Sequence, residues 1–210
     1  MLRADLYLKT IKLSKYLNRR ECIECGLSSC ESCLEAIEEG TVKSVDCLLI
    51  KRNEKYALES LNKIKDSWPH VPLLTHPRPS YTGLMEWNNP DEESLLLITG
   101  NNEFTEQVLL TVLETTACPF YVIFVDTCGN TIDMSMVYQT FTVEGIRQAI
   151  CSSGLEKRSA GKEMIIPGLA DSLREEIEKL TGWNVRVGPE CAAELPLYLS
   201  ELWIPPGDSR

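Results

Sequence analysis

From residue 94 onward, two hydrophobic patterns take turns along the chain. Continuous apolar runs rich in β-branched and aromatic residues predict buried strands, and they occur at residues 94–99, 119–126, 163–166 and 183–187. Apolar residues at helical spacing separate them, at residues 104–116, 142–154, 169–182 and 195–202. Residues 131–138 hold a shorter apolar run, which we expect to form a further strand. The alternation predicts an α/β fold with a Rossmann-like, doubly wound, mostly parallel sheet.

The first 93 residues follow other patterns. Residues 52–68 have the spacing of a polar helix, whereas residues 69–93 contain five prolines and few periodic apolar residues. Proline blocks helices and removes a backbone donor, so this stretch is typical of a linker. We therefore expect a small Cys-rich helical module with a trailing helix at residues 1–68, a Pro-rich linker at 69–93 and the α/β domain at 94–205.

The loops that follow the predicted strands are the expected place for a ligand, because ligands on such sheets bind outside the carboxyl ends of the strands. These loops are residues 99–103, 126–131, 167–170 and 188–192. Each of them carries a glycine, which lets a backbone approach a ligand closely. The same glycines also suit tight turns between strand and helix, and the sequence leaves both interpretations open.

Charge and composition narrow the class of protein. The 31 acidic and 21 basic residues give a formal net charge of -10, which argues against nucleic acid or an anionic membrane as the main partner. The apolar runs are far shorter than the ~20 residues that cross a bilayer, and we find no pattern of a signal peptide. We therefore expect a cytoplasmic protein. The chain has only two histidines, His70 and His76, which argues against a catalytic site built on histidine.

The distribution of the nine cysteines points to a metal site. Five of them fall close together near the start, at Cys22, Cys25, Cys30, Cys33 and Cys47. An odd count without a signal peptide argues against a disulfide framework. The first three and the last are spaced C-x2-C-x4-C-x16-C, and four thiolates are the common ligand set of a [4Fe-4S] cluster. The alternatives are zinc held by the first four, although zinc pairs usually lie further apart, or free thiols.

These residues resemble a known family. Residues 21–47 resemble the small [4Fe-4S] domain of the corrinoid iron-sulfur protein, and residues 94–203 resemble the corrinoid-binding domain of its large (gamma) subunit, from the acetyl-CoA decarbonylase/synthase pathway. The second resemblance lies in LLLITGNN, FVDTCGNT, FTVEGI, IIPGLADSLREEIEKLTGWNVRVGP and ELPLYLSELW. The chain departs from the family in having only the Pro-rich stretch where the family has a TIM barrel, so we expect a shortened relative that lacks the barrel.

The resemblance implies two cofactors, a [4Fe-4S] cluster on Cys22, Cys25, Cys30 and Cys47 and a corrinoid (cobalamin) over the sheet. The corrinoid contacts it implies are Thr99, Asn101, Asp126, Thr127, Cys128, Gly129, Thr131, Met134, Pro167, Gly168, Leu169, Gly188, Pro189 and Ala192. Met134 lies eight residues after Asp126, where a related mercury-methylating protein has a cysteine below the cobalt. A thioether there either shields the lower face of the cobalt or is ordinary core. Cys128 stands where the family often has an acidic residue.

The resemblance also implies a function in anaerobic methyl transfer. The chain would be a methyl-group carrier of a methyltransferase system, its cobalt cycling between Co(I) and methyl-Co(III), with the cluster supplying the electron for reductive activation. Its partners would be a methyltransferase or another corrinoid-pathway protein and a redox partner, with no nucleic acid and no membrane. The alternative is an iron-sulfur electron-transfer protein or a corrinoid-accessory binding protein without methyl-transfer activity of its own.

Overall fold

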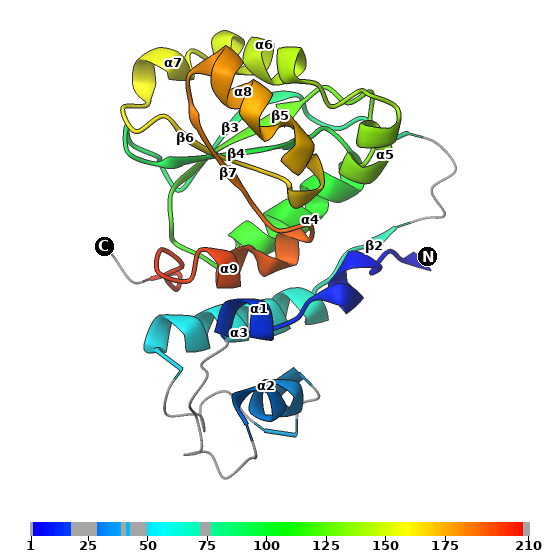
Figure 1. Ribbon diagram of the computed structural model, residues 1–210, viewed down its shortest axis with the longest axis vertical. Helices are drawn as coiled ribbons and strands as arrows, with labels where there is room; N and C mark the ends of the chain where they lie inside the picture. The colour runs from blue at the N-terminus through cyan, green and yellow to red at the C-terminus, as the bar shows by residue number, and fades with distance from the viewer. Residues whose placement is uncertain (1, 18–28, 39–40, 43–49, 72–76, 208–210) are drawn as a thin grey trace.

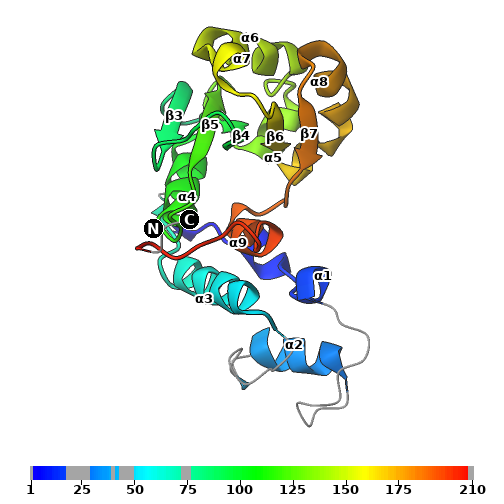
Figure 2. The same cartoon turned by 90° about the vertical axis from the view of Figure 1, so that its left-hand side faces the viewer.

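The computed structural model describes residues 2–17, 29–38, 41–42, 50–71 and 77–207. Helices cover both faces of a central sheet, and the segments from the start of the chain lie below that sheet in the view of Figure 1. In the perpendicular view α2 (Cys30–Glu38) lies farthest from the sheet, with α1 (Ser14–Leu17) and α3 (Arg52–Asp66) between them (Figure 2). No helix in the described ranges has the length and apolar character needed to cross a membrane.

The central sheet has five strands in the order β3-β5-β4-β6-β7. Four are parallel, namely β4 (Leu95–Gly100), β5 (Phe120–Val125), β6 (Glu163–Ile166) and β7 (Asn184–Val187). The edge strand β3 (Gly83–Trp87) runs antiparallel to β5 and comes from the Pro-rich stretch. Since β4 pairs with β5 on one side and β6 on the other, the strand order reverses beside β4. The predicted mostly parallel α/β sheet is confirmed.

Alternate strand residues face two separate hydrophobic cores, as expected for a sheet buried on both faces. On one face the strands pack with α6 (Val143–Ser153) and α8 (Arg174–Thr181). On the other they pack with α4 (Glu103–Leu113) and α9 (Leu195–Tyr198), and this core continues into α3 and α1. The shorter helices are α7 (Leu155–Arg158), η1 (Tyr7–Thr10), η3 (Gly168–Leu173) and η4 (Ala192–Glu194).

One sequence prediction about this domain is wrong. Residues 131–138, expected as a strand, contain helix α5 (Ile132–Val137). Thr131 has the extended backbone of a residue before a helix, and its carbonyl accepts from the Ser135 backbone N–H at 2.8 Å. Ile132 and Ser135 are buried three residues apart, which is the spacing of one helix face. The apolar run is therefore divided between a buried and an exposed face rather than alternating along a strand.

Two features connect the described segments of the first 71 residues with one another and with the sheet domain. The short strand β1 (Leu2–Arg3) pairs antiparallel with β2 (His70–Val71). The buried face of α3, which holds Ala57, Leu58, Leu61 and Ile64, packs in the core shared with α4 and α9. The expected helix at residues 52–68 is therefore present as α3, and the division into module, linker and domain stays a prediction.

Candidate functional site

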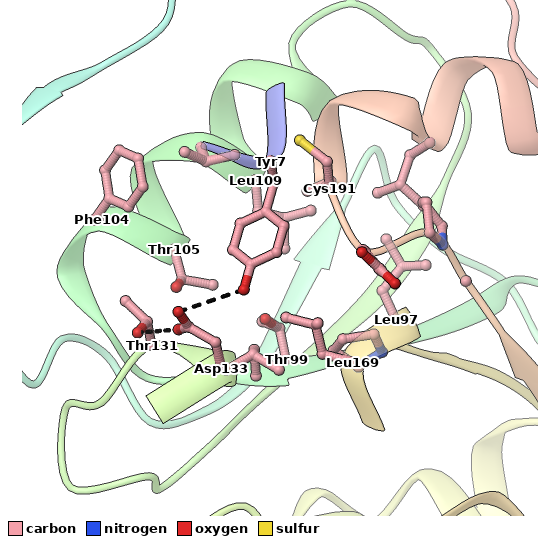
Figure 3. Close-up of a pocket in the computed structure, with 18 of the residues that line it drawn as sticks. Tyr7, Leu97, Thr99, Phe104, Thr105, Leu109, Thr131, Asp133, Leu169 and Cys191 are labelled. Carbon is pink, nitrogen blue, oxygen red and sulfur yellow. Dashed lines mark hydrogen bonds between the residues drawn. The ribbon is translucent and has the colours of Figure 1, made fainter. Parts of the chain in front are cut away.

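A cavity of about 290 Å³ lies at the carboxyl ends of β4 and β6, where the strand order reverses. This is the position at which open α/β sheets bind ligands. Strand residues such as Leu97 and Ile165 form its floor, α4 contributes Val108 and Leu109, and the loops after the strands form its walls. Figure 3 shows Leu97, Thr99 and Leu109 among the side chains around this space. The lining is predominantly apolar, which suits an organic ligand with a large apolar surface.

Half of the residues that the resemblance implies as corrinoid contacts line this cavity. They are Thr99, Thr131, Pro167, Leu169, Gly188, Pro189 and Ala192. They come from the ends of β4, β6 and β7 and from the start of α5, so loops distant in the sequence meet at one edge of the sheet. Gly168 lies behind them: a Cβ there would be 2.8 Å from the Glu190 nitrogen, and its absence lets the loops after β6 and β7 touch. The assignment of these residues to a corrinoid stays a prediction.

Several other lining residues were not among the predicted contacts, and some of them are polar or come from outside the sheet domain. Glu190 and Cys191 lie inside the loop 188–192 that the sequence analysis named but were not chosen as contacts, and Asp133 lies two residues beyond the loop 126–131. Tyr7 and Trp68 come from the segment before the sheet domain and reach the cavity through tertiary packing. No local pattern in the sequence signals that approach.

Tyr7 and Asp133 meet at the mouth of the cavity (Figure 3). The Tyr7 hydroxyl donates to Asp133 Oδ2 at 3.5 Å, and the Thr131 hydroxyl donates to Asp133 Oδ1 at 2.5 Å. Burial raises the pKa of Tyr7, and the carboxylates of Asp133 and Glu190 raise it further because they disfavour a second negative charge. Tyr7 therefore remains a neutral hydrogen-bond donor at physiological pH.

Cys191 lies in the wall of the cavity and is buried. Burial raises the pKa of its thiol to about 12, since a thiolate would lose its solvation there. Only thiolates are effective nucleophiles and metal ligands. Cys191 therefore contributes a small, neutral surface to the cavity.

A second group of predicted contacts holds the loops after β4 and β5 together. Asn101 Oδ1 accepts from the backbone nitrogens of Thr127 at 2.8 Å and Gly129 at 3.2 Å, and from the Thr127 hydroxyl at 2.9 Å. The Gly129 carbonyl accepts from the Arg78 backbone nitrogen at 2.9 Å and from Asn102 Nδ2 at 2.7 Å. Asn101 and Thr127 are buried and do not line the cavity, so their contacts described here are with the protein itself.

The remaining predicted contacts are exposed. Asp126 and Cys128 lie at the surface of the loop after β5, where the Cys128 backbone nitrogen donates to Asp126 Oδ1 at 2.9 Å. Met134 lies on α5 and is 39% exposed. None of the three lines the cavity. Met134 is therefore not an ordinary core residue, and its predicted position below a cobalt ion stays a prediction.

Of the predicted cluster ligands, only Cys30 lies in the described residues; Cys22, Cys25 and Cys47 lie outside them. Cys30 is the first residue of α2 and is half-buried, with its thiol 3.9 Å from the Leu17 carbonyl oxygen. Cys33, one turn later, is buried in the hydrophobic core. Within the described ranges no three metal-ligating side chains gather. Cys30 is half-buried and packs against the same core, whereas Cys33 is fully buried in it.

Comparison with known proteins shows which family and which relatives the sequence is similar to. The family described as CO dehydrogenase/acetyl-CoA synthase delta subunit matches residues 35–199. The gamma subunit of the acetyl-CoA decarbonylase/synthase complex from Methanopyrus kandleri is 29% identical over 146 residues, 65% of this chain and 32% of that protein. Its counterpart from Methanothermobacter thermautotrophicus is 32% identical over 145 residues, 64% of this chain and 32% of that protein.

A third relative, the corrinoid/iron-sulfur protein large subunit of Moorella thermoacetica, is 29% identical over 130 residues, 62% of this chain and 28% of that protein. The chain thus spans about a third of the length of these relatives. The family match includes β4 to β7 and most of the cavity lining, and it extends over well over half of the chain. The chain belongs to the CO dehydrogenase/acetyl-CoA synthase delta subunit family.

Proposed function

We propose that this chain is a methyl carrier like the corrinoid iron-sulfur protein, with a corrinoid bound over the sheet and a [4Fe-4S] cluster on Cys22, Cys25, Cys30 and Cys47. The observation that carries the proposal is the apolar cavity at the strand reversal, because its walls are built from the stretches that resemble the corrinoid-binding domain. The relative from Moorella thermoacetica is named a corrinoid/iron-sulfur protein, and the other two relatives are named as gamma subunits of the acetyl-CoA decarbonylase/synthase complex.

Each part of the cavity would have a separate role toward the corrinoid. The small and apolar residues Leu169, Gly188 and Pro189 would contact the edge of the ring, and Thr99 would offer a hydroxyl at the end of β4. Neither histidine of the chain lies in residues 94–205, so this domain has no imidazole to place below a cobalt ion. When bound, the corrinoid supplies a metal that accepts and releases methyl groups, and the cluster supplies single electrons.

The partners would be proteins of the same pathway, because the gamma-subunit relatives are named as subunits of the acetyl-CoA decarbonylase/synthase complex. We propose that a methyltransferase or another corrinoid-pathway protein exchanges methyl groups with the chain, and that a redox partner reduces its cluster. The formal net charge of -10 suits recognition by a basic protein surface. We propose a cytoplasmic location for this exchange.

A second candidate function is an iron-sulfur electron-transfer protein or a corrinoid-accessory binding protein without methyl transfer of its own. The size of the cavity favours it. About 290 Å³ lies just below the range of roughly 300–1,000 Å³ for small-molecule pockets, and a corrinoid with its nucleotide tail is larger than an ordinary small molecule. In this case the cluster functions while the sheet domain stores, delivers or no longer holds corrinoid.

Titration of the oxygen-free, cluster-reconstituted chain with hydroxocobalamin separates the two functions. A methyl carrier retains cobalamin through gel filtration, and the absorption spectrum of the reduced complex changes when methyl iodide is added. Iron without retained cobalamin supports the electron-transfer function. Cobalamin that is retained but never methylated supports the accessory function.

Two pairs of variants assign the sites. Leu169→Glu places a charge in the cavity wall and should abolish cobalamin retention, whereas Leu180→Glu changes a half-exposed residue outside the cavity and should not. Cys25→Ser should remove the iron, whereas Cys151→Ser, at an exposed position on α6, should leave it. Equal cobalamin retention in both leucine variants would place the corrinoid elsewhere.

A further inference from the structure

The cavity has a roof that comes from the start of the chain. Ala4, Leu6 and Tyr7 lie over the carboxyl edge of the sheet and line the cavity from the side opposite the strands. Trp68, two residues after the end of α3, supports them, because its Nε1 donates a hydrogen bond to the Ala4 carbonyl at 3.0 Å. Two segments more than 60 residues apart therefore close the space that the loops after β4, β6 and β7 form.

A hydrogen bond joins the roof to α5. The Tyr7 hydroxyl reaches across the mouth to Asp133 at the start of α5, at 3.5 Å (Figure 3). Asp133 is itself fixed by the Thr131 hydroxyl. Because 3.5 Å is long for a hydrogen bond, this contact closes the mouth without holding it firmly.

Leu8 is the main hydrophobic anchor of the roof, and Tyr7 packs against the same core. Within residues 4–10, Leu8 is the one buried side chain, while Leu6 is 70% exposed. The floor residues Leu97 and Ile165, by contrast, are nearly fully buried. Segments with few buried contacts open locally at a much lower free energy than a core does. Displacing the roof would withdraw Leu8 and Tyr7 from the core that they share with Leu97 and Leu109, but it would leave the strands and α4 paired and packed with each other.

The closed cavity is also too small for the ligand that its walls suit. Tyr7 and Leu6 are among the residues that bound its volume of about 290 Å³. The limit on the size of a ligand thus comes from the roof, since the strand ends and α4 belong to the core.

We propose that residues 4–10 are a displaceable cap, which covers the cavity in the corrinoid-free chain through Tyr7 and Asp133 and leaves the mouth when a corrinoid binds. The inference rests on the proposed function, since it takes the corrinoid as the ligand. It adds that the chain shields its own empty site, and that corrinoid competes with the cap. Apparent affinity is then lowered by the fraction of chains that are closed.

Amide hydrogen exchange on the full chain, with and without hydroxocobalamin, tests the displacement directly. The cap predicts that exchange in residues 4–10 becomes about tenfold faster or more when cobalamin binds, while amides of β4 and α4 are unchanged or slower. Exchange in residues 4–10 that stays the same or slows in the cobalamin-bound chain overturns the cap and leaves the methyl-carrier proposal standing.

A matched pair of tyrosine variants provides the second test. Tyr7→Ala removes the closing contact and should bind hydroxocobalamin about tenfold more tightly than wild type, as expected when a mostly closed site is opened. Tyr81→Ala removes the same side chain at a half-exposed position outside the cavity and should bind like wild type. Thermal unfolding confirms that both are folded.

The outcomes separate the two proposals. Equal affinities for wild type, Tyr7→Ala and Tyr81→Ala overturn the cap alone. Cobalamin binding by Tyr7→Ala but not by wild type supports the cap in its strongest form. Absence of binding in all three folded proteins overturns the corrinoid function, and the cap with it.

Discussion

Replacing Asn101 with alanine tests whether one buried side chain holds the two ligand loops in place. Its Oδ1 accepts from the backbone nitrogens of Thr127 and Gly129, and its Nδ2 donates to Thr82 Oγ1 at 2.9 Å and Asp126 Oδ1 at 3.2 Å. Asn101 is 2% exposed, so water cannot easily replace these contacts. Asn101→Ala therefore leaves two backbone N–H groups in the interior without an acceptor.

The magnitude follows from those two groups. Each buried donor left without a partner costs about 1–3 kcal/mol. The Thr127 hydroxyl adds little because the Asn130 carbonyl, at 2.9 Å, remains available as its acceptor. We expect Asn101→Ala to lower the free energy of unfolding by about 3 kcal/mol, which corresponds to a fall of roughly 6–12 °C in Tm for a chain of this size.

Urea unfolding followed by circular dichroism measures this change on the cofactor-free, reduced chain. Asn184→Ala is the control, since Asn184 is exposed at the start of β7, and surface substitutions usually stay within about 0.5 kcal/mol of wild type. An Asn101→Ala variant as stable as Asn184→Ala would refute the conclusion that the Asn101 side chain fixes the loops after β4 and β5.

Three further predictions concern single positions. Burial and the hydrogen bond to the Glu194 carboxylate raise the pKa of Tyr16 above its ordinary 10.0. The stability that Tyr16 contributes is therefore complete below pH 10 and is lost as the pH rises further. In unfolding measured over a series of pH values, the free energy of unfolding of Tyr16→Phe should fall less steeply above pH 10 than that of wild type. Gly129→Ala, whose Cβ would lie 2.3 Å from backbone, should cost about 3 kcal/mol or more, against about 1–2 kcal/mol for Gly154→Ala, which has the same positive φ and open space; equal losses in thermal unfolding would contradict the clash. In peptide mapping after iodoacetamide, exposed Cys128 should react in the native chain and buried Cys191 only after unfolding; early labelling of Cys191 would contradict its burial.

The sequence was most informative where burial alone decides structure. The strand over Glu163–Ile166 has the predicted bounds because an apolar run between parallel neighbours has no other stable arrangement. The edge strand Gly83–Trp87 was missed, since prolines flank it and its pairing with β5 is a tertiary contact. Residues 131–138 were wrongly predicted as a strand because a short apolar run does not distinguish a strand from a helix.

The candidate site divides in the same way. Residues at or directly after strand ends, such as Thr99 and Pro167, could be placed from the sequence because ligands on this class of sheet bind where the strands end. Asn101 and Thr127 follow the same rule, but their side chains turn inward to each other, which depends on the path of the loops. Tyr7 arrives from the far end of the chain, and only packing brings it there.

The central claim is that one chain holds both an iron-sulfur cluster and a corrinoid. Metal analysis of the full chain, reconstituted without oxygen and offered hydroxocobalamin before gel filtration, measures both at once. The account predicts about four iron atoms and about one cobalt atom per chain, with cobalt lost in Leu169→Glu. Zinc in place of iron, together with no retained cobalt, would contradict it.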